Sequence, residues 1–390
     1  MLIFNWVQLD KRHFTSLPAI PINEETLTEV CRSIKHNGNG PLPPTTKPLD
    51  DVLCRIPNVL VDGHLRAERP VLYIMVDETI FHANDEEKFI WVSADNPNFP
   101  LTKKSEGACI MCLDFVLSTG EYVELTDSEF AQLRANVPGV FSDDDRAAVF
   151  YLEYGKARDG YMDSGMFLDK FRRALRLAHA KYPHCQFVFI VDRSSVHERY
   201  ADNALRVTGM NVKPGGKQPK LRQTAFEKDG ELIIQDMVFP PDHPEFPNEP
   251  KGLLAVCEER GLLSAGDSRL KEDLQALLKL QPDFRHERSL LHELIEDEFG
   301  DVLLLLPKFH PELNGIEYVW ARQKEYARRN CSRGIVKLRQ TIRDARKSVP
   351  LETRQNCFLH ARQYAYAYLD RDSSNSPNAS GKVLLSSQST

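Results

Sequence analysis

The chain has 390 residues, of which 42% are hydrophobic and 27% are charged, and its formal net charge is −6. A chain of this length can bury a sizeable core and form two or three domains. No apolar run approaches the ~20 residues that span a bilayer, and the first residues lack the basic region and cleavage site of a signal peptide. These features exclude membrane-spanning and secreted classes, so we expect an intracellular globular protein.

The eight cysteines are too dispersed for the disulfide framework of a secreted domain. Cys109 and Cys112 form a CxxC pair, but they lie in the strand-like run GACIMCLDFVL. No second pair of cysteines or histidines completes a zinc site. We interpret both cysteines as core residues.

The first 66 residues differ in composition from the rest of the chain. They contain the proline-rich stretch GPLPPTTKP and one short helical candidate at residues 24–34. We expect residues 1–66 to form a short N-terminal segment. It is too short and too proline-rich to hold a helix-turn-helix domain.

Strand-like runs rich in β-branched and aromatic residues begin at residue 71. The runs at 71–81, 89–95 and 107–117 follow one another closely, which predicts a three-stranded antiparallel meander. A further strand is expected at 148–154. The stretch between 117 and 148 is interpreted as irregular.

A helix and two buried strands are expected next. Apolar residues recur at helical spacing across 162–182, and Pro183 stops this helix. The runs QFVFIVD (186–192) and DVLLLLP (301–307) are continuous and apolar, which is typical of strands covered on both faces.

Proline-rich and charged segments between these two strands predict a helical and irregular insertion at about residues 213–300. A helix follows the last strand and continues, with one break near residues 332–334, into basic C-terminal helices at 331–370. The Ser- and Asn-rich residues 371–390 are expected to be a disordered tail. The order of elements predicts an α/β fold with a mixed sheet flanked by helices.

Three carboxylates lie at the ends or in the interior of these core elements. Asp77 follows five apolar residues in the first strand, Asp192 ends a buried strand, and Glu317 opens the helix after LPKFHPELN. A lone buried charge is costly unless it is paired or binds a cation. If the fold brings the three acids together, their repulsion is relieved by hard divalent cations, which prefer oxygen ligands.

Structural roles remain open for Glu317 and Asp192 taken alone. Asn314 and Glu317 have the N-x-x-E spacing of a capping box, in which the glutamate only satisfies a backbone N–H. Asp192 could cap the turn into SSVHERY. Glu78, next to Asp77, could be the functional acid in its place.

Four sequence blocks together resemble the DDE transposases of the mariner superfamily, and most closely the DDE-endonuclease-like proteins of fungal transposable elements. The blocks are VDETIFHAND (76–85), FIVDRSSVH (189–197), MNVKPGGKQPKLR (210–222) and LPKFHPELNGIEYVW (306–320). They occur in the family's order across roughly residues 70–330.

The resemblance implies an RNase H-like catalytic domain at residues 67–330. In such a domain Asp77, Asp192 and Glu317 would be the catalytic residues and the ligands of two Mg²⁺ or Mn²⁺ ions. The implied activity is metal-dependent DNA cleavage and strand transfer at transposon ends. The implied partners are transposon-end and target DNA, with a homodimer as a further expectation, and the implied location is the nucleus.

Two segments have a local excess of positive charge that could bind DNA phosphates. Residues 322–347 contain ten Lys or Arg against two acids, and KPGGKQPKLR (213–222) contains four and no acid. The alternative is a solvated helix face and a basic turn. The candidate DNA-binding residues are Lys213, Lys217, Lys220, Arg222, Lys324, Arg328 and Arg329.

Other residues near the acids have less specific roles. Trp320 is expected in the core, and packing or surface roles are favoured for His197 and His310. Arg193 follows Asp192 where the family usually has Asn or Gln, and Gly315 stands where the family usually has proline. With no helix-turn-helix domain expected, these departures keep open an alternative function, a catalytically inactive or truncated transposase-derived DNA-binding protein. An unrelated nuclease acting on RNA–DNA hybrids is a third possibility.

Overall fold

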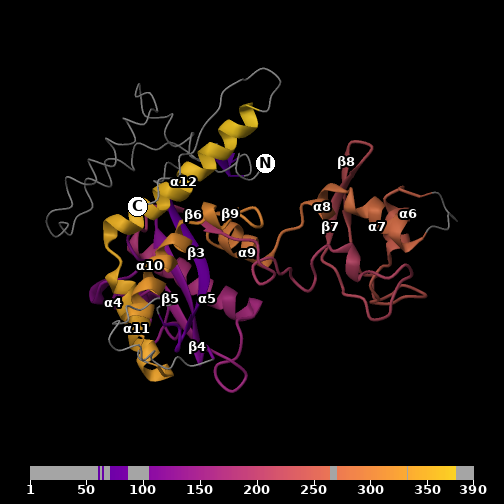
Figure 1. Ribbon diagram of the computed structural model, residues 1–390. Helices are drawn as coiled ribbons and strands as arrows, with labels where there is room; N and C mark the ends of the chain where they lie inside the picture. The colour runs from indigo at the N-terminus through magenta and orange to yellow at the C-terminus, as the bar shows by residue number, and fades with distance from the viewer. Residues whose placement is uncertain are drawn as a thin grey trace, which may run out of the picture. The chain divides into compact units, whose positions relative to one another are not determined.

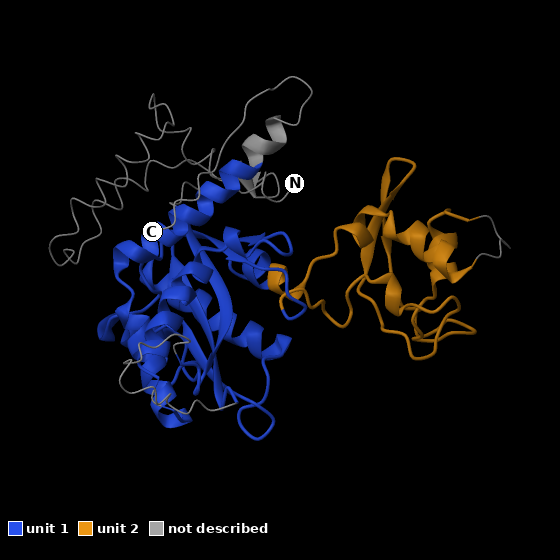
Figure 2. Cartoon of the chain, in the orientation of Figure 1, with its two compact units in different colours: residues 1–196, 294–390 blue, residues 197–293 orange. Residues whose placement is uncertain are grey.

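The computed structural model describes residues 60–61, 64–65, 71–86, 105–263, 270–331 and 333–374. The chain divides into two compact units, which Figure 2 shows in different colours. Unit 1 comprises residues 1–196 and 294–390, and unit 2 comprises residues 197–293. The expected strand at 89–95 and most of the N-terminal segment lie outside the described residues.

Unit 1 is built on a five-stranded mixed sheet with the order β5-β4-β3-β6-β9. Its strands are β3 (Val71–His82), β4 (Cys109–Leu117), β5 (Val149–Tyr154), β6 (Gln186–Val191) and β9 (Val302–Leu305). β4 is antiparallel to both of its neighbours, whereas β6 is parallel to β3 and to β9. The predicted α/β class with a mixed sheet is confirmed. The meander predicted from residues 71–81, 89–95 and 107–117 is wrong, because β3 pairs directly with β4 and the third strand of the meander is β5. A separate two-stranded ladder joins β1 (Leu60–Val61) and β2 (His64–Leu65).

The central strands form where the sequence is continuously apolar. All six residues of β6 are buried, and β3 is buried from Val71 through Asp77. The two strands lie side by side in parallel register, with Val71 opposite Gln186. Because helices cover both faces of the sheet, neither strand needs an alternating polar face.

Helices pack on the two faces of this sheet (Figure 1). On one face, α5 (Ser164–Lys181) places Phe171 against Phe115 of β4 and Phe189 of β6. The other face packs against α10 (Gly315–Arg329), α11 (Ile335–Ser348) and α12 (Leu351–Ser374) in one shared hydrophobic core. Trp320 is 1% exposed in that core and meets the edge of Phe81, so its predicted core position is confirmed.

The C-terminal helices differ in two respects from the expectation. The helical region has a second break at Val349–Pro350, where proline lacks the backbone N–H that a continuing helix needs. Its last helix, α12, extends to Ser374, so residues 371–374 of the expected disordered tail are helical. The remainder of that tail lies outside the described residues.

The stretch after β4 contains a helix where an irregular segment was expected. α4 (Asp127–Asn136) buries only Phe130, so it has almost no apolar periodicity. Its beginning is nevertheless marked by a capping box, in which the Thr126 side chain accepts from the Glu129 backbone N–H while the Glu129 carboxylate accepts from the Thr126 N–H.

Unit 2 has its own hydrophobic core and covers most of the expected insertion. Its elements are η1 (Val207–Gly209), β7 (Thr224–Lys228), β8 (Glu231–Gln235), α6 (Leu253–Glu259), α7 (Lys271–Lys279), α8 (Pro282–Arg285) and α9 (Leu290–His292). The β7–β8 hairpin was not predicted, although its turn residues Asp229 and Gly230 adopt the left-handed φ values, 52° and 83°, that an Asp-Gly turn favours. Arg260 holds this unit together by donating to Asp283 and Gln235.

Short helical turns complete the chain, η2 (Glu293–Glu298) before β9 and η3 (Pro311–Leu313) before α10. None of the helices in the described ranges is both long and apolar enough to cross a membrane. Cys109 and Cys112 are free thiols on β4. Cys112 is fully buried, as expected of a core residue, whereas Cys109 is only partly buried.

Candidate metal-binding carboxylate site

Asp77 lies in the interior of β3, directly opposite Asp114 in the antiparallel register with β4. Residues paired in this way project from the same face of a sheet. The Asp114 carboxylate is fully buried and accepts two bonds from the Arg346 guanidinium of α11, at 2.8 and 3.2 Å. Arg346 therefore neutralises Asp114.

Glu317 comes to Asp77 from the first turn of α10. A side-chain hydrogen bond joins the two carboxyl groups. Because ionised carboxylates are acceptors only, one of the two must carry a proton in this arrangement. Lys324, two turns further along α10, lies close enough for its charge to act on Glu317.

Asn314 and Gly315 set the position of that helix turn. The side-chain amide of Asn314, 2% exposed, donates to the carbonyl oxygen of Val76 at 3.0 Å, one residue before Asp77. A β-carbon at Gly315 would overlap the sulfur of Met75 and lie 3.0 Å from the backbone oxygen of Cys357 in α12. Glycine therefore lets α10 begin in close contact with β3.

The capping-box interpretation of Asn314 and Glu317 is wrong. Asn314 occupies the N-cap position, but its side chain makes no capping hydrogen bond, because its amide is used on Val76 of the neighbouring strand. The Glu317 side chain is directed to Asp77. Both side chains thus connect α10 to β3.

Asp192 completes the group of acids at the end of β6. It follows directly after Val191, and β6 is the parallel neighbour of β3. The charge of Asp192 acts on both Asp77 and Glu317. The three acids expected from the sequence therefore approach one another, although long stretches of chain separate them.

Burial and crowding of negative charge act on the protonation of these groups. The pKa of Asp77 is well above its usual value, first because the group is buried and then because Glu317, Glu78 and Asp192 repel its charged form. Burial and Asp192 also raise the pKa of Glu317, although the hydrogen bond with Asp77 and the charge of Lys324 oppose the shift. A single negative charge shared by Asp77 and Glu317 is thus favoured over two.

Glu78 is a fourth acid in the group. One possible ligand oxygen of Glu78 lies within 4.8 Å of one of Asp192. Both residues belong to unit 1. The sequence alternative in which Glu78 is the functional acid in place of Asp77 therefore remains open.

The donor set fits hard divalent cations. The four acids of unit 1 offer only carboxylate oxygens, the ligands preferred by Mg²⁺ and Mn²⁺, and no thiol is among them. The raised pKa values indicate negative charge that the nearby cation Lys324 does not fully compensate. Asp77, Asp192 and Glu317, with Glu78, could hold such ions.

The candidate DNA-binding residues of unit 1 lie along α10. Arg328 bonds to Asp85 at 3.0 Å, and Arg329 bonds to Glu325 one turn before it. Both side chains remain partly exposed, at 40% and 62%. The pairs on these arginines are surface pairs, which contribute little to stability.

The candidate DNA-binding residues of unit 2 fall into two groups. Lys213, Lys217 and Lys220 are exposed. Arg222 is two-thirds buried and forms ion pairs with both Glu287 and Glu293.

The loop that carries these lysines has a defined shape. The buried Gln218 side chain accepts from the Asn211 N–H and donates to the carbonyl of Gly215. Gly215 and Gly216 adopt φ values of 76° and 77°, which glycine reaches without strain. The loop is thus fixed from inside while its lysines face outward.

The two histidines discussed in the sequence analysis are partly or fully buried. His310 bonds to Glu312 at 2.7 Å and meets the edge of Tyr368. His197 is 1% exposed. Sequence analysis missed the anchoring role of Asn314, and the only available signal was that an Asn precedes the helix.

Comparison of the chain with protein-family models and with curated proteins finds no match.

Proposed function

We propose that unit 1 is a metal-dependent nuclease domain of the DDE transposase type, with an RNase H-like fold, that cleaves phosphodiester bonds of DNA and transfers the freed end. The observation that carries the proposal is the convergence of Asp77, Asp192 and Glu317. A hydrogen bond joins the first to the third, and the charge of Asp192 acts on both. Repelling carboxylates held together in a folded core are a typical preformed site for divalent ions.

The sheet topology supports the RNase H-like assignment. In chain order β3 is the first strand of the five-stranded sheet and carries Asp77, and Asp192 follows the fourth strand, β6. Glu317 lies in the first of the helices that follow the last strand. The resemblance implies a triad with its acids on the first strand, after the fourth strand and on the final helix. The first two locations match, whereas α10 is followed by α11 and α12.

The chain's own groups have separable tasks in this proposal. When bound, two divalent ions would activate the attacking oxygen and stabilise the leaving one. Asp77 and Glu317 must release their shared proton before both carboxylates can act as ligands, so binding is coupled to proton release. Asn314 and Gly315 hold Glu317 against β3. Lys324, Arg328 and Arg329 offer positive charge for the phosphates along α10.

Cleavage of labelled duplex DNA in the presence of Mn²⁺ tests the proposal. Asp192→Asn and Glu317→Gln each remove one ligand charge with little change of shape, and each is expected to lower the cleavage rate at least about 100-fold. Glu325→Gln is the matched control, because it makes the same change on the same helix at a surface residue whose ion-pair partners are Arg322 and Arg329. Equal cleavage by wild type and Asp192→Asn would end the nuclease proposal.

Two alternatives are distinguished in the same assay. DNA binding without Mn²⁺-dependent cleavage, unchanged in Asp192→Asn, would identify a catalytically inactive transposase-derived DNA-binding protein. Preferential cleavage of an RNA–DNA hybrid over duplex DNA would identify a nuclease that uses the same carboxylate site on a different substrate class. Size-exclusion chromatography with light scattering, with and without DNA, tests the proposed homodimer.

A further inference from the structure

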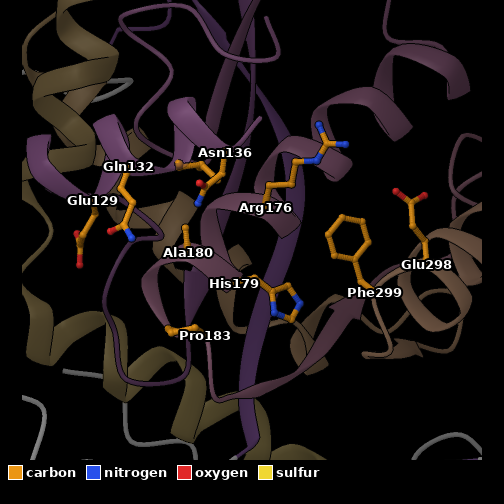
Figure 3. Close-up of a pocket in the computed structure, with 10 residues that line it drawn as sticks. Glu129, Gln132, Asn136, Arg176, His179, Ala180, Pro183, Glu298 and Phe299 are labelled. Carbon is orange, nitrogen blue, oxygen red and sulfur yellow. The ribbon is translucent and has the colours of Figure 1, made fainter. Parts of the chain in front are cut away.

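A groove separate from the carboxylates lies at the other end of β6. It has a volume of about 560 Å³, within the usual range of small-molecule sites. Residues of α4, of α5 and of the turn before β9 line it, and Figure 3 shows them as sticks. Pro183 of its wall precedes β6, whereas Asp192 follows β6, so roughly 20 Å of strand separates the two places.

One wall of the groove carries two nitrogen-bearing side chains. Arg176 and His179 lie one turn apart on α5, and therefore on the same face of that helix. Among the described residues, no carboxylate forms an ion pair with Arg176. An uncommitted guanidinium in a groove is a binding group for a phosphate or carboxylate.

His179 is held in place from the inside of the domain. Its Nε2 lies 2.8 Å from a carboxylate oxygen of Asp301, which is 1% exposed and also accepts from the backbone N–H of Phe187 at 2.9 Å. An ionised carboxylate only accepts, so Nε2 carries the hydrogen of that bond and Nδ1 is the remaining polar atom of the ring. Within the described part of the chain no group hydrogen-bonds to this Nδ1.

An aromatic surface adjoins these polar groups. The ring of Phe299 stacks on the His179 ring, with centroids 5.7 Å apart and an interplanar angle of 23°. Leu133, Ala180 and Pro183 add apolar wall. A flat ring is the ligand portion that such a surface accommodates best.

Of the remaining polar side chains in the groove, two carboxylates are hydrogen-bonded within the protein and two carboxamides are not. Glu298 is bonded to Arg172 through both oxygens, at 3.2 and 3.0 Å, and Glu129 is used in the capping box of α4. The carboxamides of Gln132 and Asn136 make no hydrogen bond to other described residues. Carboxamides pair well with the donor and acceptor edges of nucleobases.

We propose that this groove between α4 and α5 binds a nucleotide, with its phosphate on Arg176 and its base against Phe299. The nucleotide is either a free mononucleotide or the terminal residue of a single strand of DNA, because both present the same ring and phosphate. Gln132 and Asn136 contact the base edge, and His179 Nδ1 contacts the sugar or the phosphate. The site is independent of the metal-binding carboxylates and of the function proposed for them.

Ligand-observed NMR titrations of the full-length protein without metal test the site. The probes are dAMP, deoxyadenosine, deoxyribose 5-phosphate and a 5′-phosphorylated d(A)₄ strand. Arg176→Gln is expected to weaken dAMP binding about tenfold and to leave deoxyadenosine unchanged. Phe299→Leu is expected to weaken dAMP and deoxyadenosine by a similar factor and to leave deoxyribose 5-phosphate unchanged.

Controls separate binding from folding and from the carboxylates. Arg134→Gln makes the same charge change on α4 outside the groove, where Arg134 pairs with Asp143. Gln132→Ala removes a proposed contact to the base edge at an exposed position, so a loss of binding in this variant cannot be attributed to misfolding. Asp77→Asn is expected to bind dAMP as the wild type does.

The outcomes are decisive in both directions. A d(A)₄ strand that binds more tightly than dAMP assigns the groove to single-stranded DNA, and equal affinity assigns it to free mononucleotides. Absence of dAMP binding by the wild type would overturn the proposal. So would equal affinity of wild type and Arg176→Gln for dAMP.

Discussion

The backbone of Gly315 lies against the side chain of Met75, with no room for a β-carbon between them. This contact joins the start of α10 to β3 two residues before Asp77. It explains why proline, which the resemblance leads one to expect at this position, is absent. The approach of Glu317 to Asp77 depends on it.

Gly315→Ala is expected to destabilise the protein by about 1–3 kcal/mol, because the new methyl group overlaps Met75 and approaches the backbone of α12. Urea unfolding measures this loss, and calorimetry measures a parallel loss of Mn²⁺ affinity as Glu317 moves away. Met75→Ala in the same chain makes room, so the double variant should lose less than the sum of the two single losses. Strict additivity would contradict a steric origin.

Asn314→Ala is expected to destabilise the protein by about 1–3 kcal/mol, because it leaves the carbonyl of Val76 without the 3.0 Å bond from the Asn314 amide in a buried place. Asn330→Ala is the matched control. Its amide makes the same kind of bond to the carbonyl of Tyr326, at 2.9 Å, but in an exposed position at the other end of α10. Thermal unfolding should separate the two variants, and a larger loss for Asn330→Ala would refute the anchoring role.

The stability advantage of Asp77→Asn over the wild type, both without metal, is expected to grow as pH rises above the usual aspartate pKa. Asp77 has a raised pKa in the folded state, so the folded chain binds this proton more tightly than the unfolded chain does. Below the usual aspartate pKa both states hold the proton and the group has no effect. Above it only the folded state retains the proton, and stability declines. Asp77→Asn removes this decline and should be more stable than wild type at pH 8.

Thermal unfolding across this pH range measures the Asp77 effect, with Asp202→Asn, at an exposed position of unit 2, as the control. Adding Mn²⁺ at pH 8 should raise the midpoint of the wild type and not that of Asp77→Asn. A stability difference between wild type and Asp77→Asn that stays the same from pH 4 to pH 8 would contradict the shared proton.

Arg346→Met is expected to destabilise the protein by about 3–5 kcal/mol, because it leaves the fully buried Asp114 without its partner. Arg343→Met, at an exposed position on the same helix, should change stability by no more than about 0.5 kcal/mol. Combining Arg346→Met with Asp114→Asn should recover part of the loss. If Arg346→Met and Arg343→Met unfold at the same urea concentration, the pair has no structural role.

Lys213, Lys217 and Lys220 are expected to contribute to DNA affinity, whereas Arg222 contributes to the stability of unit 2. Replacing the three exposed lysines by Gln should weaken DNA binding and lower the slope of log affinity against log salt by up to about three. Arg222→Gln breaks the pairs with Glu287 and Glu293, so unit 2 should become more sensitive to proteolysis with a smaller change in salt slope. A slope that responds to Arg222 alone would reverse this assignment.

The core strands could be predicted from the sequence because a strand that is buried on both faces consists of an unbroken apolar run. β6 and β9 are such runs, and both formed where expected. α4 was missed for the opposite reason, since a helix that buries only Phe130 shows no period. The Thr126 to Glu129 capping box was the available signal, and it requires no periodicity.

The candidate site could be named from the sequence, but its geometry could not be derived from it. Three acids at strand ends and a helix start were visible, and the structure brings Glu317 to Asp77. The close approach at Gly315 depends on β3, α10 and α12 at once, so no local pattern reveals it. The same holds for Asn314, whose spacing to Glu317 resembled a cap although its amide is used elsewhere.

Unit 2 is inserted in the chain between β6 and β9. These two strands are neighbours in the sheet, with Val188 of β6 opposite Val302 of β9. The residues that stay with unit 1 on either side, 192–196 and 294–301, together reach the dozen or so needed for a crossover between parallel strands. The length and content of the excursion are therefore decoupled from the integrity of the sheet. The pairing of β6 with β9 therefore places no limit on the length of the segment inserted between them.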